Sequence, residues 1–176
     1  YKSKQVPARG KNCTAQQMPY LKERVKTYKE FASSNLQELL GDSFEAAIHY
    51  QVTELRSGVF INNSDSFEFT PFPIEAQMSP VTAIIYEDID HDSVRDLIMG
   101  GNNYHTEAET TRLDAGIGVF LKGVSDGKFA FQKNRETGLY TSGDVKDMLL
   151  ITHKNKKKLL VANNNSKFQL YNIKDK

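Results

Sequence analysis

The sequence repeats itself at a nearly constant interval, and this periodicity restricts the fold more than any other feature. Residues 58–69, which contain Gly-Val-Phe-Ile and then Phe-Glu-Phe, have a counterpart at 118–131. Residues 96–102 recur at almost the same offset at 158–164, where Asp-Leu-Ile-Met-Gly-Gly-Asn becomes Lys-Leu-Leu-Val-Ala-Asn-Asn. Internal periodicity of this kind is typical of solenoids, propellers and other arrays of similar units.

Short apolar runs alternate with clusters of Asn, Asp, Ser and Gly from residue 46 onward. Runs of this length, rich in β-branched and aromatic residues, predict the strands of a β-meander. At about four strands per repeat, the natural unit is a propeller blade. The expected fold class is therefore mainly β: a partial β-propeller of two to three four-stranded antiparallel blades, with a short α-helical insertion near the N-terminus.

The predicted blades occupy residues 46–176. Residues 46–72 are expected to form a partial blade, residues 80–132 a complete blade and residues 145–173 a final blade that lacks a strand. This is fewer than the roughly four blades that close a ring. The open strand edges are therefore expected to be covered by the remaining blades of a parent chain or by other protein chains.

The only clearly helical stretch precedes the strands. Residues 1–13 are predicted to be a connecting arm, and residues 14–45 a helical insertion of two or three short helices. A capping box, in which two side chains satisfy the free amides of a first helical turn, is predicted at three positions: Thr14, Thr27 and Ser34. Gly41 is a predicted helix end.

Charge and cysteine content exclude several classes of protein. Lys and Arg together number 23 and Asp and Glu 22, so the net charge is +1 and offers no basic excess for nucleic acid. The sequence contains no run of 18 apolar residues, so no transmembrane segment is expected. The single Cys13 excludes an internal disulfide. Because the sequence starts at Tyr1 without a signal-like segment, we expect a piece of a longer chain.

The sharpest local motif is the acidic segment 88–96, Asp-Ile-Asp-His-Asp-Ser-Val-Arg-Asp. Its carboxylates fall at positions 1, 3, 5 and 9, and alternate residues of a tight loop turn their oxygens inward. Ca²⁺ takes six to eight oxygens, and position 7 can add a backbone carbonyl. The segment therefore predicts a calcium site with these ligands: Asp88, Asp90, Asp92, Val94 through its carbonyl, and Asp96.

Two features distinguish this segment from a helix–loop–helix calcium loop. Position 12 is Met99 instead of a bidentate Glu, and the flanking runs are strand-like, which places the loop inside a blade. Position 6, where Gly supplies a positive φ, is Ser93, so either Ser93 accepts this strain or the loop relaxes. The alternative interpretation is an acidic hairpin turn without an ion.

The segment 104–114 is a long polar insertion between two strands of the complete blade, and such loops often carry recognition. The candidate recognition residues are Tyr104, His105, Glu107, Glu109, Arg112 and Asp114. Tyr104 could stack on a sugar or a peptide, and Arg112 could pair with a carboxylate. In the alternative, Arg112 and Asp114 pair with neighbouring residues and close the loop.

Motifs of catalysis are missing from the sequence. None of the histidines stands at zinc-ligand spacing, and neither a Gly-x-Ser-x-Gly elbow nor a phosphate-binding glycine loop occurs. The lysines of segment 154–158 are interpreted as a solvated hairpin tip. The chain is therefore expected to be non-catalytic. The enzymatic alternative is a polysaccharide-active fragment that uses Glu107 and Asp114 as paired carboxylates.

Taken together, these motifs resemble a known family. The acidic segment and the residues that follow it are similar to the FG-GAP or VCBS repeat of integrin-like β-propellers. Further segments resemble, in order, the C-terminal portion of Bacteroidetes proteins of the ASPIC/UnbV-associated type: 9–14, 17–19, 27–32, 76–80, 101–104, 112–115 and 143–145. The resemblance extends from about residue 9 to residue 172.

The resemblance implies a many-bladed parent chain, often lipid-anchored, that is exported to the bacterial cell surface, the outer membrane or the periplasm. It implies the calcium role for the acidic segment, and no calcium in the final blade, where a lysine run takes its place. The implied function is a calcium-stabilised binding or scaffold module that makes protein–protein or glycan contacts. An architectural subunit of an outer-membrane complex is the other non-catalytic alternative.

Overall fold

The structure is a computed structural model that describes residues 4–108, 110–125, 127–154 and 156–174. The chain divides into two compact units, with the boundary between Thr53 and Glu54. The first unit is helical and the second is built of β-sheets. None of the helices in the described ranges is long and apolar enough to cross a membrane.

Short helices packed on a small shared core make up the first unit. They are α1 (Lys11–Gln17), α2 (Leu21–Arg24), α3 (Tyr28–Ser33), α4 (Leu36–Leu40) and α5 (Ser43–Ala46). Helices of this length are marginal on their own. They are held by one buried apolar cluster, which comprises Ala15, Leu21, Val25, Phe31 and Leu39.

The boundaries of the helical unit differ in part from those predicted. The first helix begins at Lys11, inside the predicted connecting arm, and Thr14 lies within this helix instead of capping one. Gly41 ends α4 as predicted, and its positive φ of 58° is the conformation for which glycine is suited.

Capping boxes form at the starts of α3 and α4, the first of them as predicted. The Thr27 side chain accepts from the Glu30 amide, and the Glu30 side chain accepts from the Thr27 amide. The second box was predicted at Ser34 but is made by Asn35 and Glu38. Ser34 is instead the C-cap of α3, and Asn35, whose backbone is extended, takes the N-cap position of α4.

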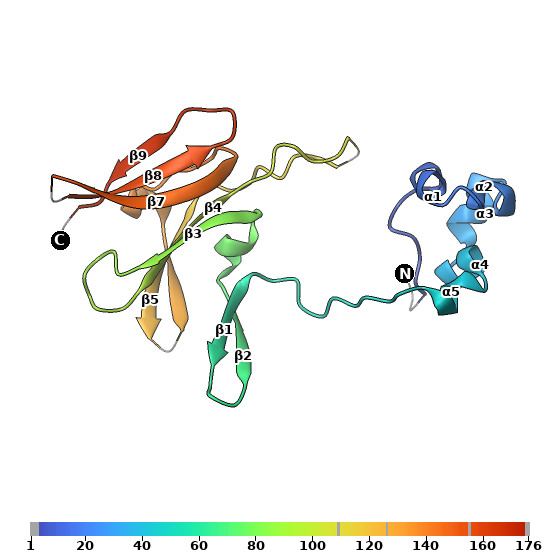
Figure 1. Ribbon diagram of the computed structural model, residues 1–176, viewed down its shortest axis with the longest axis horizontal. Coiled ribbons are helices and arrows are strands. Elements are labelled where there is room, and N and C mark those ends of the chain that lie inside the picture. Colours follow the sequence, from blue (N-terminus) through green and yellow to red (C-terminus); the bar gives the residue numbers. More distant parts are fainter. Residues whose placement is uncertain (1–3, 109, 126, 155, 175–176) are drawn as a thin grey trace. The chain divides into compact units, whose positions relative to one another are not determined.

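Antiparallel sheets of two, four and three strands make up the described part of the second unit (Figure 1). The first pairs β1 (Gly58–Asn62) with β2 (Phe67–Pro71). The second has the order β3 (Val81–Glu87), β4 (Asp96–Gly101), β5 (Val119–Ser125), β6 (Lys128–Gln132), and the third the order β7 (Val145–His153), β8 (Lys156–Asn163), β9 (Gln169–Asn172). The connections contain the short helices η1 (Ile74–Gln77) and α6 (Asn134–Thr137). The chain is thus mainly β, which confirms the coarser part of the predicted fold class.

The four-stranded and three-stranded sheets repeat each other strand by strand. The pairs β3–β4 and β7–β8 have the same register, and both carry an irregularity at the same place. It lies between Val81 and Ala83 in the first pair and between Val145 and Asp147 in the second. Since bulges are specific features of a strand pair, the shared bulge supports a true structural repeat.

The strand ends are closed in the same way in both sheets. The Asn102 amide donates to the Pro80 carbonyl at 3.1 Å, and the Asn164 amide donates to the Asp144 carbonyl at 2.8 Å. The sequence periodicity therefore extends to the hydrogen bonds that finish each strand pair.

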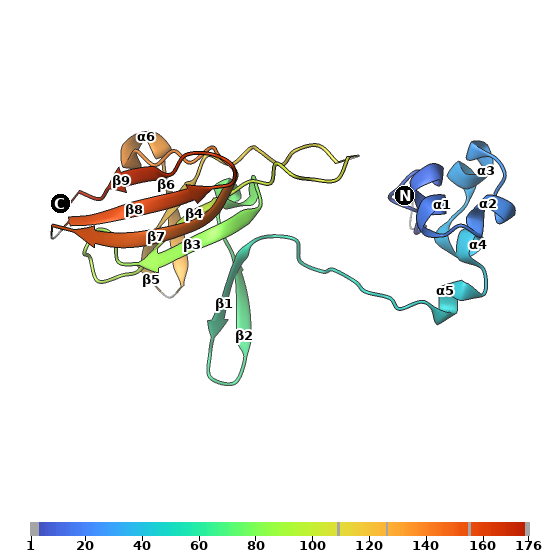
Figure 2. The ribbon, with the colours of Figure 1, turned by 45° about the horizontal axis from the view of Figure 1, so that its top comes forward.

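The two larger sheets pack against one another through β7, which lies alongside β3 and β4 (Figures 1 and 2). The Thr82 hydroxyl donates to the Val145 carbonyl across this boundary. The buried residues between the sheets are Ala83, Ile98, Leu139, Val145, Met148, Leu159 and Val161. Because side chains alternate along a strand, a second cluster lies on the other face of β4 and includes Leu97 and Met99.

The hairpin β1–β2 is joined to the four-stranded sheet through the segment that follows it. The Phe72 ring lies edge-on to the Phe129 ring, with the centroids 5.6 Å apart. The Gln77 side chain binds the backbone of Ser57. Residues 46–57, which were assigned to the partial blade, contain no strand.

Candidate functional site

The acidic segment forms the loop between β3 and β4, and Asp96 is the first residue of β4. Carboxylate oxygens of Asp88, Asp90 and Asp96 lie within 4.8 Å of one another. A Ca²⁺ ion lies about 2.3–2.6 Å from each ligand, so it can join oxygens up to about 5 Å apart. These three carboxylates are therefore close enough to share one ion.

The Asp88 carboxylate holds the backbone of the loop by accepting hydrogen bonds from two later residues. It accepts from the amide of Asp92 at 3.1 Å and from the amide of Ser93 at 3.0 Å. Ser93 and His91 have positive φ values of 72° and 61°. Of the two alternatives for position 6, Ser93 thus accepts the left-handed backbone, at a cost of about 1–2 kcal/mol for a residue with a Cβ.

The fully buried Asp96 ties the loop to the neighbouring strand. Its carboxylate accepts from the amide of Ile89 at 3.0 Å and from the amide of Gly123 on β5 at 2.9 Å. A Cβ at Gly123 would stand 2.2 Å from the Arg95 carbonyl oxygen, so only glycine permits this approach. The second half of the loop is therefore positioned by β5.

Lys122 on β5 is a residue of the candidate site that the sequence analysis did not identify. It forms ion pairs with Asp90 and, at 2.6 Å, with Asp92. The hydrogen bonds to Asp90 and Asp92 raise the pKa of Lys122, and the bond from Lys122 lowers the pKa of Asp92. Because Lys122 lies far along the chain from the acidic segment, no local motif points to it.

Two of the predicted calcium ligands lie differently from the others. Asp92 turns one oxygen toward Lys122 and accepts the Val94 amide on the other at 2.9 Å, and it is not part of the close group of three. Val94 thus contributes its N–H to the loop. The structure brings Asp88, Asp90 and Asp96 together and leaves Asp92 at the rim.

The predicted recognition loop is closed by its own residues and by the next sheet. The Arg112 guanidinium lies 3.9 Å from the centroid of the Tyr104 ring and pairs with Asp114 at 3.4 Å. The Tyr104 hydroxyl donates to the Ser142 carbonyl at 2.7 Å. One face of the ring that was expected to stack on a ligand is therefore covered by Arg112.

The two carboxylates of the enzymatic alternative, Glu107 and Asp114, bind different partners within the loop. Glu107 accepts from the Thr110 hydroxyl at 2.8 Å, whereas Asp114 pairs with Arg112. Glu109 lies outside the described residues. Both carboxylates of the enzymatic alternative are thus engaged within the loop by other groups.

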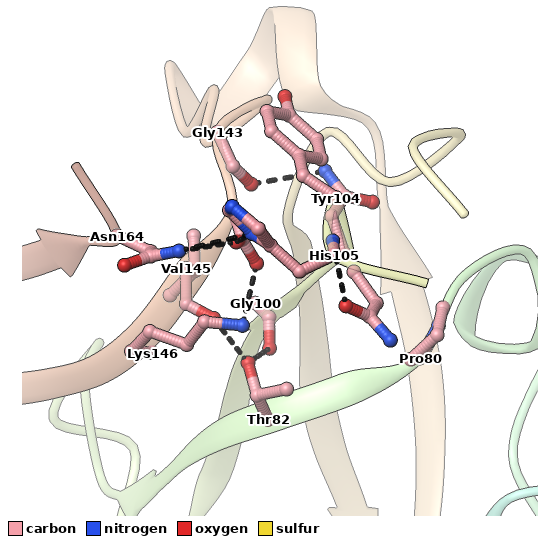
Figure 3. Close-up of polar contacts among 12 residues, drawn as sticks. Pro80, Thr82, Gly100, Tyr104, His105, Gly143, Val145, Lys146 and Asn164 are labelled. Carbon is pink, nitrogen blue, oxygen red and sulfur yellow. Dashed lines mark hydrogen bonds and ion pairs between the residues drawn. The ribbon is translucent and has the colours of Figure 1, made fainter. Parts of the chain in front are cut away.

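His105 reaches the residues that flank β7 and β8, and its ring lies beside the Asn164 side chain, with Nδ1 3.3 Å from the Asn164 side-chain nitrogen (Figure 3). Its Nδ1 lies 3.7 Å from Oδ2 of Asp144, a side chain that is 1% exposed. Asp144 also accepts from Asn164 at 3.1 Å and pairs with Lys146 at 2.6 Å. Burial raises the pKa of Asp144, but the bonds from Lys146 and Asn164 outweigh it and lower the pKa overall. Asp144 is therefore a charged anchor for the loop.

The buried Asn102 holds the base of the same loop. Its side-chain oxygen accepts from the Ser79 hydroxyl at 2.6 Å and from the Gly116 amide at 2.9 Å. Its side-chain nitrogen donates to the carbonyls of Gly116, Ser142 and Gly143 at 2.9–3.2 Å. Asn102 therefore joins the four-stranded sheet to the segment that enters β7, and its role is structural.

A scan against protein-family models gave no match, and searches of curated proteins and of solved structures gave no significant match. The functional assignment therefore rests on the sequence pattern and the geometry alone.

Proposed function

We propose that the chain is a non-catalytic, calcium-stabilised binding or scaffold module made of propeller-like blades. It belongs to a larger exported protein of a bacterial cell surface, outer membrane or periplasm, and it makes protein–protein or glycan contacts. The observation that carries the proposal is the repeat of two packed antiparallel sheets with one register and one shared bulge. Blades of a propeller repeat in this way, and an unfinished ring leaves edges that bind other chain segments.

The calcium part of the proposal is supported by the acidic loop. Asp88, Asp90 and Asp96 would hold the ion, and the Val94 carbonyl and water would complete its oxygen shell. The ion would neutralise carboxylates that otherwise repel one another. Lys122 already neutralises part of this charge, so calcium has to share Asp90 with an ammonium group. We therefore place the site among weak calcium modules, with a dissociation constant of about 10⁻⁴–10⁻³ M.

Thermal unfolding of the full chain with calcium or with a chelator tests this proposal. At calcium tenfold above the dissociation constant, mass action adds about 1.4 kcal/mol to the free energy of unfolding. The variant Asp90→Ala should lose this increment. Asp147→Ala, which removes an exposed carboxylate of β7, is the matched control and should keep it. A melting temperature indifferent to both calcium and chelator would refute the calcium role.

A further inference from the structure

The contact of β7 with β3 and β4 defines two complementary kinds of sheet face. On one side, Ile85, Ile98 and Phe120 of the four-stranded sheet pack into the buried cluster between the sheets. On the other side, β7 contributes Met148 and Leu150. We call the surface of the four-stranded sheet the accepting face and the surface of β7 the inserting face.

The outer side of the three-stranded sheet repeats the accepting face. By strand register, Leu149 takes the place of Ile85, and Leu170 takes the place of Phe120. Leu149 is 57% exposed and Leu170 is 52% exposed. With Leu160 these residues form what we call the Leu149 face, an apolar surface equivalent to one that binds a sheet inside the molecule.

The outer side of β3 repeats the inserting face. Ile84 is equivalent to Met148, and Tyr86 is equivalent to Leu150. Met148 is 5% exposed, whereas Ile84 is 56% and Tyr86 54% exposed. Both side chains are accessible, although the Arg95 guanidinium lies 5.3 Å from the centroid of the Tyr86 ring, and we call this surface the Ile84 face.

The two faces carry opposite charge at the same end. Next to the Leu149 face, a hollow of about 610 Å³ is lined by basic residues that include His153, Lys154, Lys156, Lys158 and Lys174. Next to the Ile84 face, β3 leads into the acidic loop, where four carboxylates outnumber the cations of Lys122 and Arg95. Inside the molecule this end is already joined by an ion pair, with Lys157 Nζ 3.5 Å from Glu87 Oε1.

We propose, as an extension of the proposed function, that the Leu149 face binds the Ile84 face of a second copy of this chain. The contact repeats the packing of β7 on β3, with apolar side chains along the strands and the acidic loop of one copy against the lysine-lined hollow of the other. Because the contact joins two different surfaces, it is head-to-tail and each copy can hold a neighbour on either side.

Sedimentation of the full chain between about 10 μM and 1 mM, a range that brackets a weak to moderate dissociation constant, measures this association. We expect the mean mass to rise with concentration. Leu149→Asp and Tyr86→Asp should each weaken association at least about tenfold, because each places a charge in an apolar contact. Ile74→Asp replaces an exposed apolar residue that belongs to neither face and should associate normally.

An equal mixture of the two variants tests the pairing of the faces. Leu149→Asp retains the Ile84 face and Tyr86→Asp retains the Leu149 face, so together they should form a dimer that does not extend. If Leu149→Asp does not fold, the double variant Lys154→Glu with Lys156→Glu replaces it. A chain that stays monomeric, or a mixture that gives no dimer, would overturn the inference. Either result leaves the calcium proposal intact, because thermal unfolding below about 10 μM measures calcium stabilisation on the unassociated chain.

Discussion

The β3–β4 and β7–β8 corners are the same place in two repeats of one strand pair, yet they carry opposite charge. The two pairs share their register as far as Glu87–Asp96 in the first and Ile151–Lys158 in the second. Beyond this point the first pair opens into the acidic loop, whereas the second continues through His153–Lys156 and turns at once.

This difference indicates that the strand pairs and the loops that join their strands are specified by different residues. The pairing of the strands depends on apolar residues that alternate along them, and both repeats share this pattern. The loop at the corner depends on the length and charge of the segment that joins the two strands. We therefore predict that affinity for a cation is a property of the acidic loop alone, and that the lysine-rich corner binds no calcium.

The largest expected effect of a single change at these corners is that of Asp96→Ala. The substitution leaves the amides of Ile89 and Gly123 without their acceptor, and buried unsatisfied donors cost about 1–3 kcal/mol each. We expect a loss of about 3 kcal/mol in the free energy of unfolding, measured by urea denaturation. The equivalent change Lys158→Ala at the other corner should stay within about 0.5 kcal/mol. Equal effects at the two corners would contradict the account.

A smaller effect is expected at Asp144, where the three-stranded sheet has a buried acid and the four-stranded sheet has Pro80. Asp144→Asn removes the charge that pairs with Lys146 and should cost about 1.5 kcal/mol at neutral pH. The native pKa of Asp144 is lowered, so its contribution is present above the unfolded value near 3.9 and is lost as pH falls through the native value.

Acid unfolding therefore separates this variant from the wild type. Below about pH 4 the stability of the wild type should fall more steeply than that of Asp144→Asn. Asp147→Asn, which alters an exposed carboxylate of the same strand, should follow the wild type. Parallel curves for the wild type and Asp144→Asn would show that Asp144 is not a charged anchor.

The smallest effect is expected from Ser93→Gly, which sharpens the account of the acidic loop. Glycine removes the Cβ strain at a φ of 72°, but it also makes the unfolded chain more flexible, at about 0.4–1 kcal/mol. The net gain in stability should therefore be about 1 kcal/mol or less, and calcium affinity in calorimetric titration should be unchanged because the strain at Ser93 is present without the ion. Weaker binding would mean that the loop changes its backbone when the ion binds.

The parts of the fold that follow from local pattern could be predicted from the sequence. Apolar runs placed the strands, the periodicity grouped them into related sheets, and Thr27 with Glu30 marked a helix start. Helix boundaries were predicted less accurately. Helix α1 begins at Lys11, inside the predicted connecting arm, because the helical conformation buries Ala15 in the shared core.

The parts of the site that depend on distant contacts could not be predicted. Asp88, Asp90 and Asp96 were visible because they are neighbours in the sequence. Lys122 and Asp144 were not assigned roles, since their partners come from other elements and only the fold brings them together. In the same way, Arg112 could be named as a charged residue, but its position over Tyr104 depends on how the loop closes.

A calcium titration of the full chain, followed by backbone amide NMR, tests whether the acidic loop binds the ion and the lysine-rich corner does not. We predict saturable shifts in residues 88–96 and at Lys122 and Gly123, with a dissociation constant of about 10⁻⁴–10⁻³ M, and no shifts at the 153–158 corner. The absence of a saturable shift in residues 88–96, or equal shifts at both corners, would contradict this prediction.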